Sequence, residues 1–166
     1  MRISDADQKS YPKFTQYISK KIPEVTKVPV IVANMKKFGG FSYDKLCSIL
    51  AWGHGPNIKI LNLRDNTQPG FNICVAGVAA AYGCTRGGET KEIEVDSITI
   101  DEFEKDPYGA GIGQNSRHQN VFVVGVTVLH ELCHLGCNLH GISEAKFTGG
   151  EAGNAFEKAT YGKSVP

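Results

Sequence analysis

Residues 121–141 read VFVVGVTVLHELCHLGCNLHG and contain two histidines, His130 and His134, four positions apart. On an α-helix, residues at this spacing share one face and lie about one turn (~5.4 Å) apart, so both imidazoles can reach one metal ion. Glu131 follows the first histidine, where its carboxylate can lie over a metal-bound water without being a ligand. This is the H-E-x-x-H arrangement of zinc hydrolases. We therefore predict that His130 and His134 bind Zn²⁺ and that Glu131 is the general base.

The apolar run before the motif predicts a helix that is buried on most of its sides. Its β-branched residues also fit a strand as far as Val128, so the start of the helix is left open. Gly136 is predicted to end the helix, because glycine tolerates the left-handed conformation that follows many helices. The chain would then turn and bring His140 back towards the metal.

The third zinc ligand is predicted to be His140, because the run has the metzincin histidine spacing H-E-x-x-H-x-x-x-x-x-H. The run departs from that pattern in two ways. Gly136 stands one place earlier than the metzincin glycine, and the chain has no methionine after the motif to form a Met-turn, because both methionines lie upstream. The alternative third ligand is Glu151, because a carboxylate on a following helix completes the set in thermolysin-like enzymes. Glu151 also fits a carboxylate at a helix N-terminus, or a hydrogen-bond partner of a ligating histidine.

Several other side chains near the motif have a weaker claim on the metal or the reaction. Glu144 and Glu157 are weaker candidates for the third ligand. Cys133 and Cys137 could bind zinc as thiolates, but we interpret them as small buried residues, because three ligands are already assigned. Tyr161 could hydrogen-bond the oxyanion of a tetrahedral intermediate, a role that tyrosine can fill. The alternative for Tyr161 is a packed aromatic ring.

Length and charge restrict the class of protein. The 166 residues are expected to form one domain (1–166) with a core that needs no disulfides or metal. The net charge of +1 argues against an electrostatic nucleic-acid binder. No apolar run approaches the ~20 residues that span a membrane, and the N-terminus MRISDADQKSYPKF has no hydrophobic signal region. Among the five cysteines, a Cys74–Cys84 disulfide is left open.

Local patterns predict an α+β chain. Helices are predicted at 11–22, at 42–50 with Ser42 as N-cap and at 152–161, and strands at 28–32, 58–63 and 92–100. Residues 71–82 fit either a close-packed helix or a buried strand. Strand 58–63 or strand 92–100 is expected at the sheet edge beside the active-site helix, where it could pair with an extended substrate. The glycine-rich residues 106–119 are expected to form a mobile flap, and they lack the GK[ST] ending of a phosphate loop.

The C-terminal third, HELCHLGCNLHG followed by GGEAGNAFEKATYG, resembles the metallopeptidase toxin domains of bacterial polymorphic-toxin and type VI secretion systems. Those domains carry an H-E-x-x-H helix and a trailing G-E-x-G-x-x-F-E-x-x-x-Y-G segment. The matching positions are His130, Glu131, His134, His140, Gly141, Glu151, Gly153, Phe156, Glu157, Tyr161 and Gly162. The chain departs from the family at Cys137 and His140, where acidic residues are expected, and this leaves the ligand set open.

The resemblance implies a zincin-like metallopeptidase fold with a small sheet beside the active-site helix. It implies a zinc-dependent endopeptidase, a hydrolase that acts on a protein or peptide as an antibacterial effector, and a cognate immunity protein that blocks its cleft. The protein would be cytoplasmic in the producer, exported without a classical signal peptide and delivered into a target cell. Two other functions stay open: a metal-dependent amidase acting on cell-wall peptides, and a non-catalytic zinc-stabilised binding module. A closed four-ligand site would favour the second.

Overall fold

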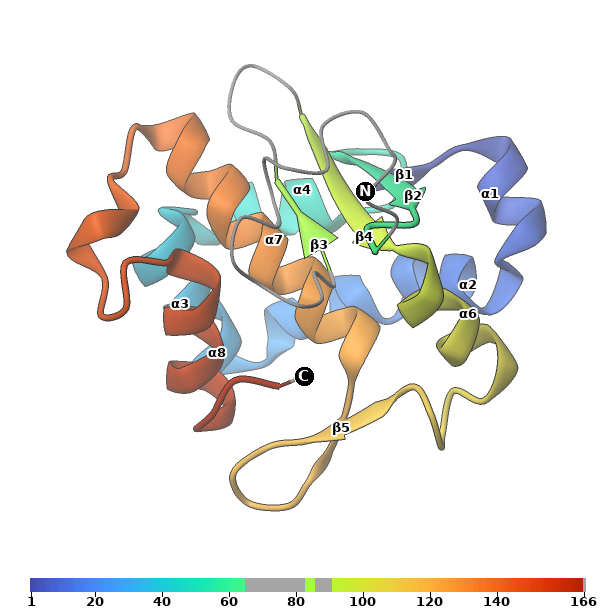
Figure 1. Cartoon of the computed structure of the whole chain (residues 1–166). Coiled ribbons are helices and arrows are strands. Elements are labelled where there is room, and N and C mark those ends of the chain that lie inside the picture. The colour runs from blue at the N-terminus through green and yellow to red at the C-terminus, as the bar shows by residue number, and fades with distance from the viewer. Residues whose placement is uncertain (65–82, 86–90, 166) are drawn as a thin grey trace.

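The longest helix in the part of the chain described here, α7 (Val123–His140), runs through the middle of the fold. The computed structural model describes residues 1–64, 83–85 and 91–165 (Figure 1). Every residue of α7 from Val123 to Leu129 is buried, as an apolar sequence without a polar face requires. Helices α3 (Pro29–Gly39) and α8 (Ala152–Tyr161) pack on one side of α7, and strands β3 (Gly83–Cys84) and β4 (Glu92–Asp96) lie on the other.

Helix α7 does not end at Gly136, so the predicted helix terminator is wrong. The helix continues to His140 and ends at Gly141, whose φ of 61° is left-handed. Gly136 serves packing instead, because a Cβ there would lie 2.1 Å from the backbone oxygen of Gly39 in α3. The missing side chain therefore lets α3 and α7 approach closely.

A four-stranded sheet stands beside α7, with the order β1-β2-β4-β3. Strands β1 (Arg2–Ile3) and β2 (Asn57–Leu61) pair in parallel, β2 and β4 do the same, and β3 is antiparallel to β4. The predicted strands at 58–63 and 92–100 correspond to β2 and β4. Both are inner strands of the described sheet, so the prediction that one of them is the edge beside α7 is wrong. That position belongs to β3.

The predicted strand at 92–100 ends early, at Asp96, because the chain turns there into helix α6 (Ser97–Lys105). The buried carboxylate of Asp96 accepts hydrogen bonds from the backbone amide of Leu63, at 3.2 Å, and from the hydroxyl of Thr99, at 3.4 Å. Thr99, Ile100 and Phe103 are the buried residues of α6, at helical spacing. The apolar alternation of the sequence therefore runs on past the true end of the strand.

The N-terminal third is helical: α1 (Asp5–Ser10), α2 (Pro12–Lys20), the short 3₁₀ helix η1 (Ile22–Lys27), α3 and α4 (Tyr43–Leu50). The predicted helices at 11–22 and 42–50 are confirmed as α2 and α4, and the hydroxyl of Ser42 accepts from the amide of Lys45 at 3.2 Å. The predicted strand at 28–32 is wrong. Pro29 begins α3, because proline is favoured in the first turn of a helix.

The C-terminal part contains a hairpin of β5 (Ile112–Gln114) and β6 (Asn120–Phe122), the short helix η2 (Glu144–Lys146) and α8, which ends at Gly162 as predicted. The turn of the hairpin is hydrogen-bonded to the end of α8, because the amide of Ser116 donates to the carbonyl of Tyr161 at 2.8 Å. Within the flap predicted at 106–119, only Ile112–Gln114 is a strand and the other residues form turns and irregular chain.

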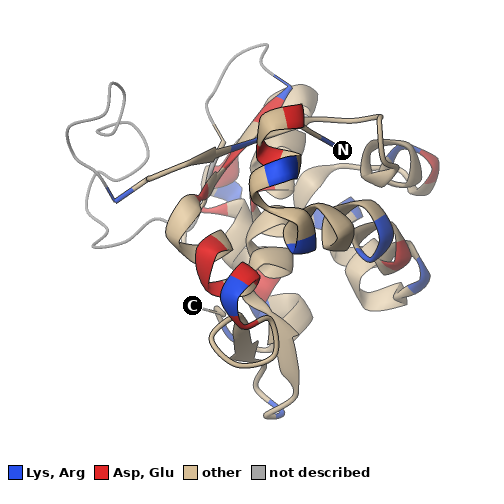
Figure 2. Cartoon of the chain, turned by 90° about the vertical axis from the view of Figure 1, so that its right-hand side faces the viewer, with Lys and Arg blue, Asp and Glu red and all other residues tan. Residues whose placement is uncertain are grey.

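The α+β class is confirmed by this mixture of helices and small sheets. Residues 71–82 and Cys74 lie outside the described residues. In the described part of the chain, no helix combines the length and apolarity needed to cross a membrane. Basic and acidic residues occur along the same helices on the side of the molecule shown in Figure 2.

Candidate metal centre

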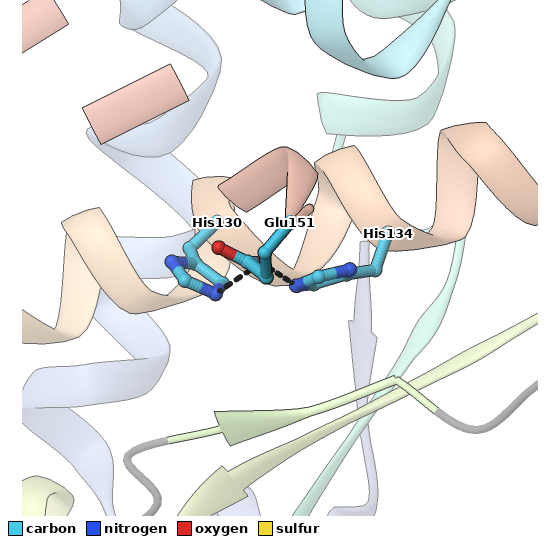
Figure 3. Close-up of side chains that lie close together, drawn as sticks. All are labelled: His130, His134 and Glu151. Carbon is cyan, nitrogen blue, oxygen red and sulfur yellow. Dashed lines mark ion pairs between the residues drawn. The ribbon is translucent and has the colours of Figure 1, made fainter. Parts of the chain in front are cut away.

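His130 and His134 point from one face of α7 towards Glu151, the residue that precedes α8 (Figure 3). The Nε2 of His130 lies 3.2 Å from Oε1 of Glu151, and the Nε2 of His134 contacts the same oxygen. One ligand atom from each residue lies within 4.8 Å of the other two. Ligands about 2.0–2.1 Å from a tetrahedral zinc ion stand about 3.3 Å apart, so two imidazoles and one carboxylate fit a three-ligand site.

Both histidines have a second carboxylate at the other ring nitrogen. The Nδ1 of His130 lies 2.5 Å from Oε1 of Glu157, and the Nδ1 of His134 lies 2.8 Å from Oε1 of Glu144. A proton on each Nδ1 is donated to its own carboxylate, so the proton on Nε2, which faces Glu151, is the one that a metal ion would replace. The arrangement therefore favours metal binding through Nε2.

Backbone amides hold these two carboxylates in place. Oε2 of Glu144 accepts from the amide of Ala152 at 2.9 Å, and Oε2 of Glu157 accepts from the amide of Val165 at 2.6 Å. Both carboxylates were weaker ligand candidates from the sequence, and their role as Nδ1 partners was missed. The available signal was general, since a ligating histidine nearly always donates its other N–H to an acceptor.

Glu151 is at once a helix cap and a neighbour of both histidines. Its side chain accepts hydrogen bonds from the amides of Gly153, at 2.9 Å, and Asn154. Burial raises the pKa of Glu151, but hydrogen bonds with His130 and His134 outweigh burial and hold it well below its usual range. The carboxylate is therefore ionised, as a metal ligand must be.

Helix α8 approaches His130 closely because Gly153 has no side chain. A Cβ at Gly153 would lie 2.2 Å from Cδ2 of the His130 ring. The glycine two places after Glu151 thus lets the start of α8 reach the histidines.

Glu131 is buried, with 4% of its surface exposed, and its side chain faces β3. The hydroxyl of Thr85, the residue after β3, donates to Oε2 of Glu131 at 2.8 Å. Burial raises the pKa of the Glu131 carboxyl, and the nearby His130 and His134 oppose this rise only in part. A carboxylate with a raised pKa is a better proton acceptor than an ordinary one.

His140 does not join His130 and His134, which corrects the prediction of His140 as third ligand. Because α7 stays helical past Gly136, His140 lies about 9 Å further along the axis than His134 and on another face. Its Nδ1 is 3.1 Å from the backbone oxygen of Gly39, and its ring packs edge-on against Phe41. The structure brings the alternative third ligand, Glu151, to the two histidines instead.

Tyr161 lies at the C-terminal end of α8, ten residues after Glu151, which is about 15 Å along the helix axis. Its ring is partly buried and packs edge-on against Phe156, and burial raises the pKa of its hydroxyl. The structure thus favours the packed aromatic ring over the oxyanion role predicted for Tyr161.

The two cysteines of α7 face α3. The thiol of Cys133 contacts the sulfur of Met35, and the thiol of Cys137 donates to the backbone oxygen of Phe38 at 3.1 Å. Their interpretation as small buried residues is confirmed.

Comparison with known protein families agrees with the geometry. The family model of metallopeptidase toxin 3 matches residues 7–162. The chain belongs to the metallopeptidase toxin 3 family. The resemblance of the C-terminal third to bacterial metallopeptidase toxin domains is confirmed, and the match extends over nearly the whole chain. No curated protein and no solved structure matches the chain.

Membership of the metallopeptidase toxin 3 family indicates a metal-dependent peptidase toxin, a hydrolase that acts on a protein substrate. A toxin of this kind is secreted and delivered. A peptidase of this class needs a metal ion, and His130, His134 and Glu151 form the cluster that could hold one.

Metal binding to this metallopeptidase toxin 3 chain should strengthen as pH rises from 6 to 9. Burial lowers the pKa of both histidines, but hydrogen bonds to Glu151 and Glu157 raise that of His130 to about 10, and hydrogen bonds to Glu144 and Glu151 raise that of His134 to about 9. Each imidazolium must lose its proton to bind a metal, so affinity should gain about tenfold per pH unit for each proton released. Competition titrations of Zn²⁺ against a chelating dye at several pH values measure this slope. A pH-independent affinity would show that neither histidine releases a proton when the metal binds, and would contradict the prediction.

Proposed function

We propose that this chain is a zinc-dependent endopeptidase in which His130, His134 and Glu151 hold the ion. The observation that carries the proposal is the pairing of each histidine Nδ1 with its own buried or half-buried carboxylate, while both Nε2 atoms meet one oxygen of Glu151. Two imidazoles and one glutamate are the ligand set of thermolysin-type catalytic zinc, which keeps a fourth position for water or substrate.

Zinc bound there would polarise the peptide carbonyl and lower the pKa of water to about 7. Glu131 would take a proton from the attacking water and deliver it to the leaving amine. Its place next to His130 puts it beside the ligands, and its burial against β3 supports the role of base, because the raised pKa favours proton uptake. His130 and His134 keep 20% and 18% of their side-chain surface exposed.

The alternative of a non-catalytic zinc-stabilised module needs a closed set of four ligands. Cys137, one of the two thiols near the motif that could bind zinc, donates instead to the backbone oxygen of Phe38. Glu131 would also serve no purpose in a structural site. Both observations favour catalysis.

The family supports a wider biological role. We propose a single zincin-like domain (1–166) that acts as an antibacterial effector, in the manner of type VI secretion toxins, and is neutralised by a cognate immunity protein. The helix-and-edge-strand arrangement of α7 and β3 supports the zincin-like fold. The toxin designation of the family supports the effector role.

Removal of the metal tests the proposed activity directly. The zinc-loaded protein is incubated with denatured casein and with a fluorogenic peptide library, and cleaved bonds are identified by mass spectrometry. A zinc chelator should lower cleavage by about 100-fold or more, and added Zn²⁺ should restore it. Cleavage that persists in the metal-free protein would overturn the proposal. Hydrolysis of purified peptidoglycan without cleavage of any peptide would show an amidase instead.

A further inference from the structure

Strand β3 and the residue that follows it enclose the carboxylate of Glu131. A Cβ at Gly83 would lie 2.7 Å from Cγ and 2.8 Å from Oε1 of Glu131, so only glycine allows this approach. On the other oxygen, the hydroxyl of Thr85 lies 2.8 Å from Oε2. The two carboxylate oxygens are therefore restricted from two sides by residues two apart in the chain.

The strand that carries these residues is itself fixed to the sheet. Gly83 pairs with Val95 and Cys84 with Glu94 in the antiparallel ladder between β3 and β4. Val95 is fully buried, and β4 is the strand that α7 packs against. The contact between Thr85 and Glu131 thus joins two elements that are already held in place, and it removes rotamer freedom from a side chain with three rotatable bonds.

We propose that Thr85 is a positioning residue that holds the Glu131 carboxylate in the orientation needed to take a proton from the attacking water. The inference rests on the proposed function of Glu131 as general base. A misplacement of about 1 Å at a reacting group can cost about 100-fold in rate, so a hydroxyl that fixes the carboxylate acts on the rate and not on substrate binding.

The same hydroxyl also lies 2.9 Å from the backbone oxygen of Glu131. It has one proton to donate, and an ionised carboxylate is the stronger acceptor of the two. If the backbone oxygen were the functional acceptor, Thr85 would only tie β3 to α7, and its loss would change stability without changing the rate of the chemical step. Kinetics separate the two roles.

The experiment compares three variants of the zinc-loaded chain on one fluorogenic peptide. Thr85→Val removes the hydroxyl at nearly constant volume, and Thr85→Ser keeps it. Thr127→Val is the matched control, because Thr127 is a buried threonine that lies beside Gly83 but donates its hydroxyl to Val123 of its own helix. Thr85→Val should lower kcat by about 10- to 100-fold. Its KM and its zinc content should match the wild type, and Thr85→Ser and Thr127→Val should keep wild-type kcat.

Wild-type kcat in Thr85→Val would overturn the role of Thr85 while leaving the proposed function intact. A rise in KM at constant kcat would also overturn it, because that pattern reports substrate binding. If Thr85→Val fails to fold, Thr85→Ala is measured in its place and judged by the same criteria. A zinc-loaded wild type that cleaves no peptide would overturn the proposed function and this role together.

Discussion

Replacement of Glu131 by glutamine should lower kcat/KM by about 10²- to 10⁴-fold without loss of zinc, because an amide cannot accept the proton of the attacking water. The side chain keeps its size, and its oxygen can still accept from the hydroxyl of Thr85. Burial already raises the pKa of Glu131, so a neutral side chain should be tolerated in the folded chain. Peptide kinetics together with metal analysis of the same preparation measure both quantities.

The control for this variant is Glu102→Gln, which makes the same chemical change on an exposed residue of α6. It should match the wild type in activity and in zinc content. Full activity in Glu131→Gln would remove Glu131 from the mechanism. Loss of zinc in that variant would show that Glu131 is a ligand and not a base.

Replacement of Glu151 by glutamine should weaken zinc binding by more than about 100-fold and abolish zinc-dependent cleavage, because loss of a ligand costs more than loss of its outer partner. The single amide oxygen of glutamine can still accept from one of the two backbone amides, Gly153 or Asn154, so α8 should start as before with one capping hydrogen bond fewer. Zinc affinity by competition titration, and helix content by circular dichroism, measure the two effects separately.

The matched variant is His140→Gln, since His140 was the first ligand expected from the sequence. It should keep zinc and activity, and lose the hydrogen bond to Gly39, about 1 kcal/mol of stability, together with the ring contact with Phe41. The opposite result, with zinc lost from His140→Gln and kept by Glu151→Gln, would restore the metzincin-like ligand set.

The local part of the site could be predicted from the sequence because it depends on one helical turn. The i, i+4 spacing of His130 and His134 places both imidazoles on one face whatever surrounds the helix. The start and end of α8 were equally local, since Gly162 takes the left-handed conformation expected after a helix.

The place of Glu151 beside the two histidines depends on a contact that the sequence does not display. Gly136 is a residue type that often ends a helix, but here the backbone of Gly39 packs against it and the helix continues. That one difference moves His140 away and leaves the place beside the histidines to Glu151. Glu151 could be weighed as an alternative because a carboxylate ligand from a following helix is a known pattern.

The partners of the site residues come from distant segments and were not predicted. Thr85 reaches Glu131 across 46 positions of sequence, and Glu157 reaches His130 across 27. The edge strand could not be predicted for the same reason. The order β1-β2-β4-β3 depends on pairing between distant segments, and not on the alternation of apolar residues within one strand.

Four carboxylates of the described chain gather around the two imidazoles at the junction of α7 and α8, those of Glu131, Glu144, Glu151 and Glu157. With pKa values of about 10 and about 9, both imidazoles carry a proton at neutral pH and offset two of these negative charges. The uptake of one divalent ion in exchange for those two protons is electroneutral. A divalent ion can therefore enter this acidic cluster without a change in the total charge enclosed.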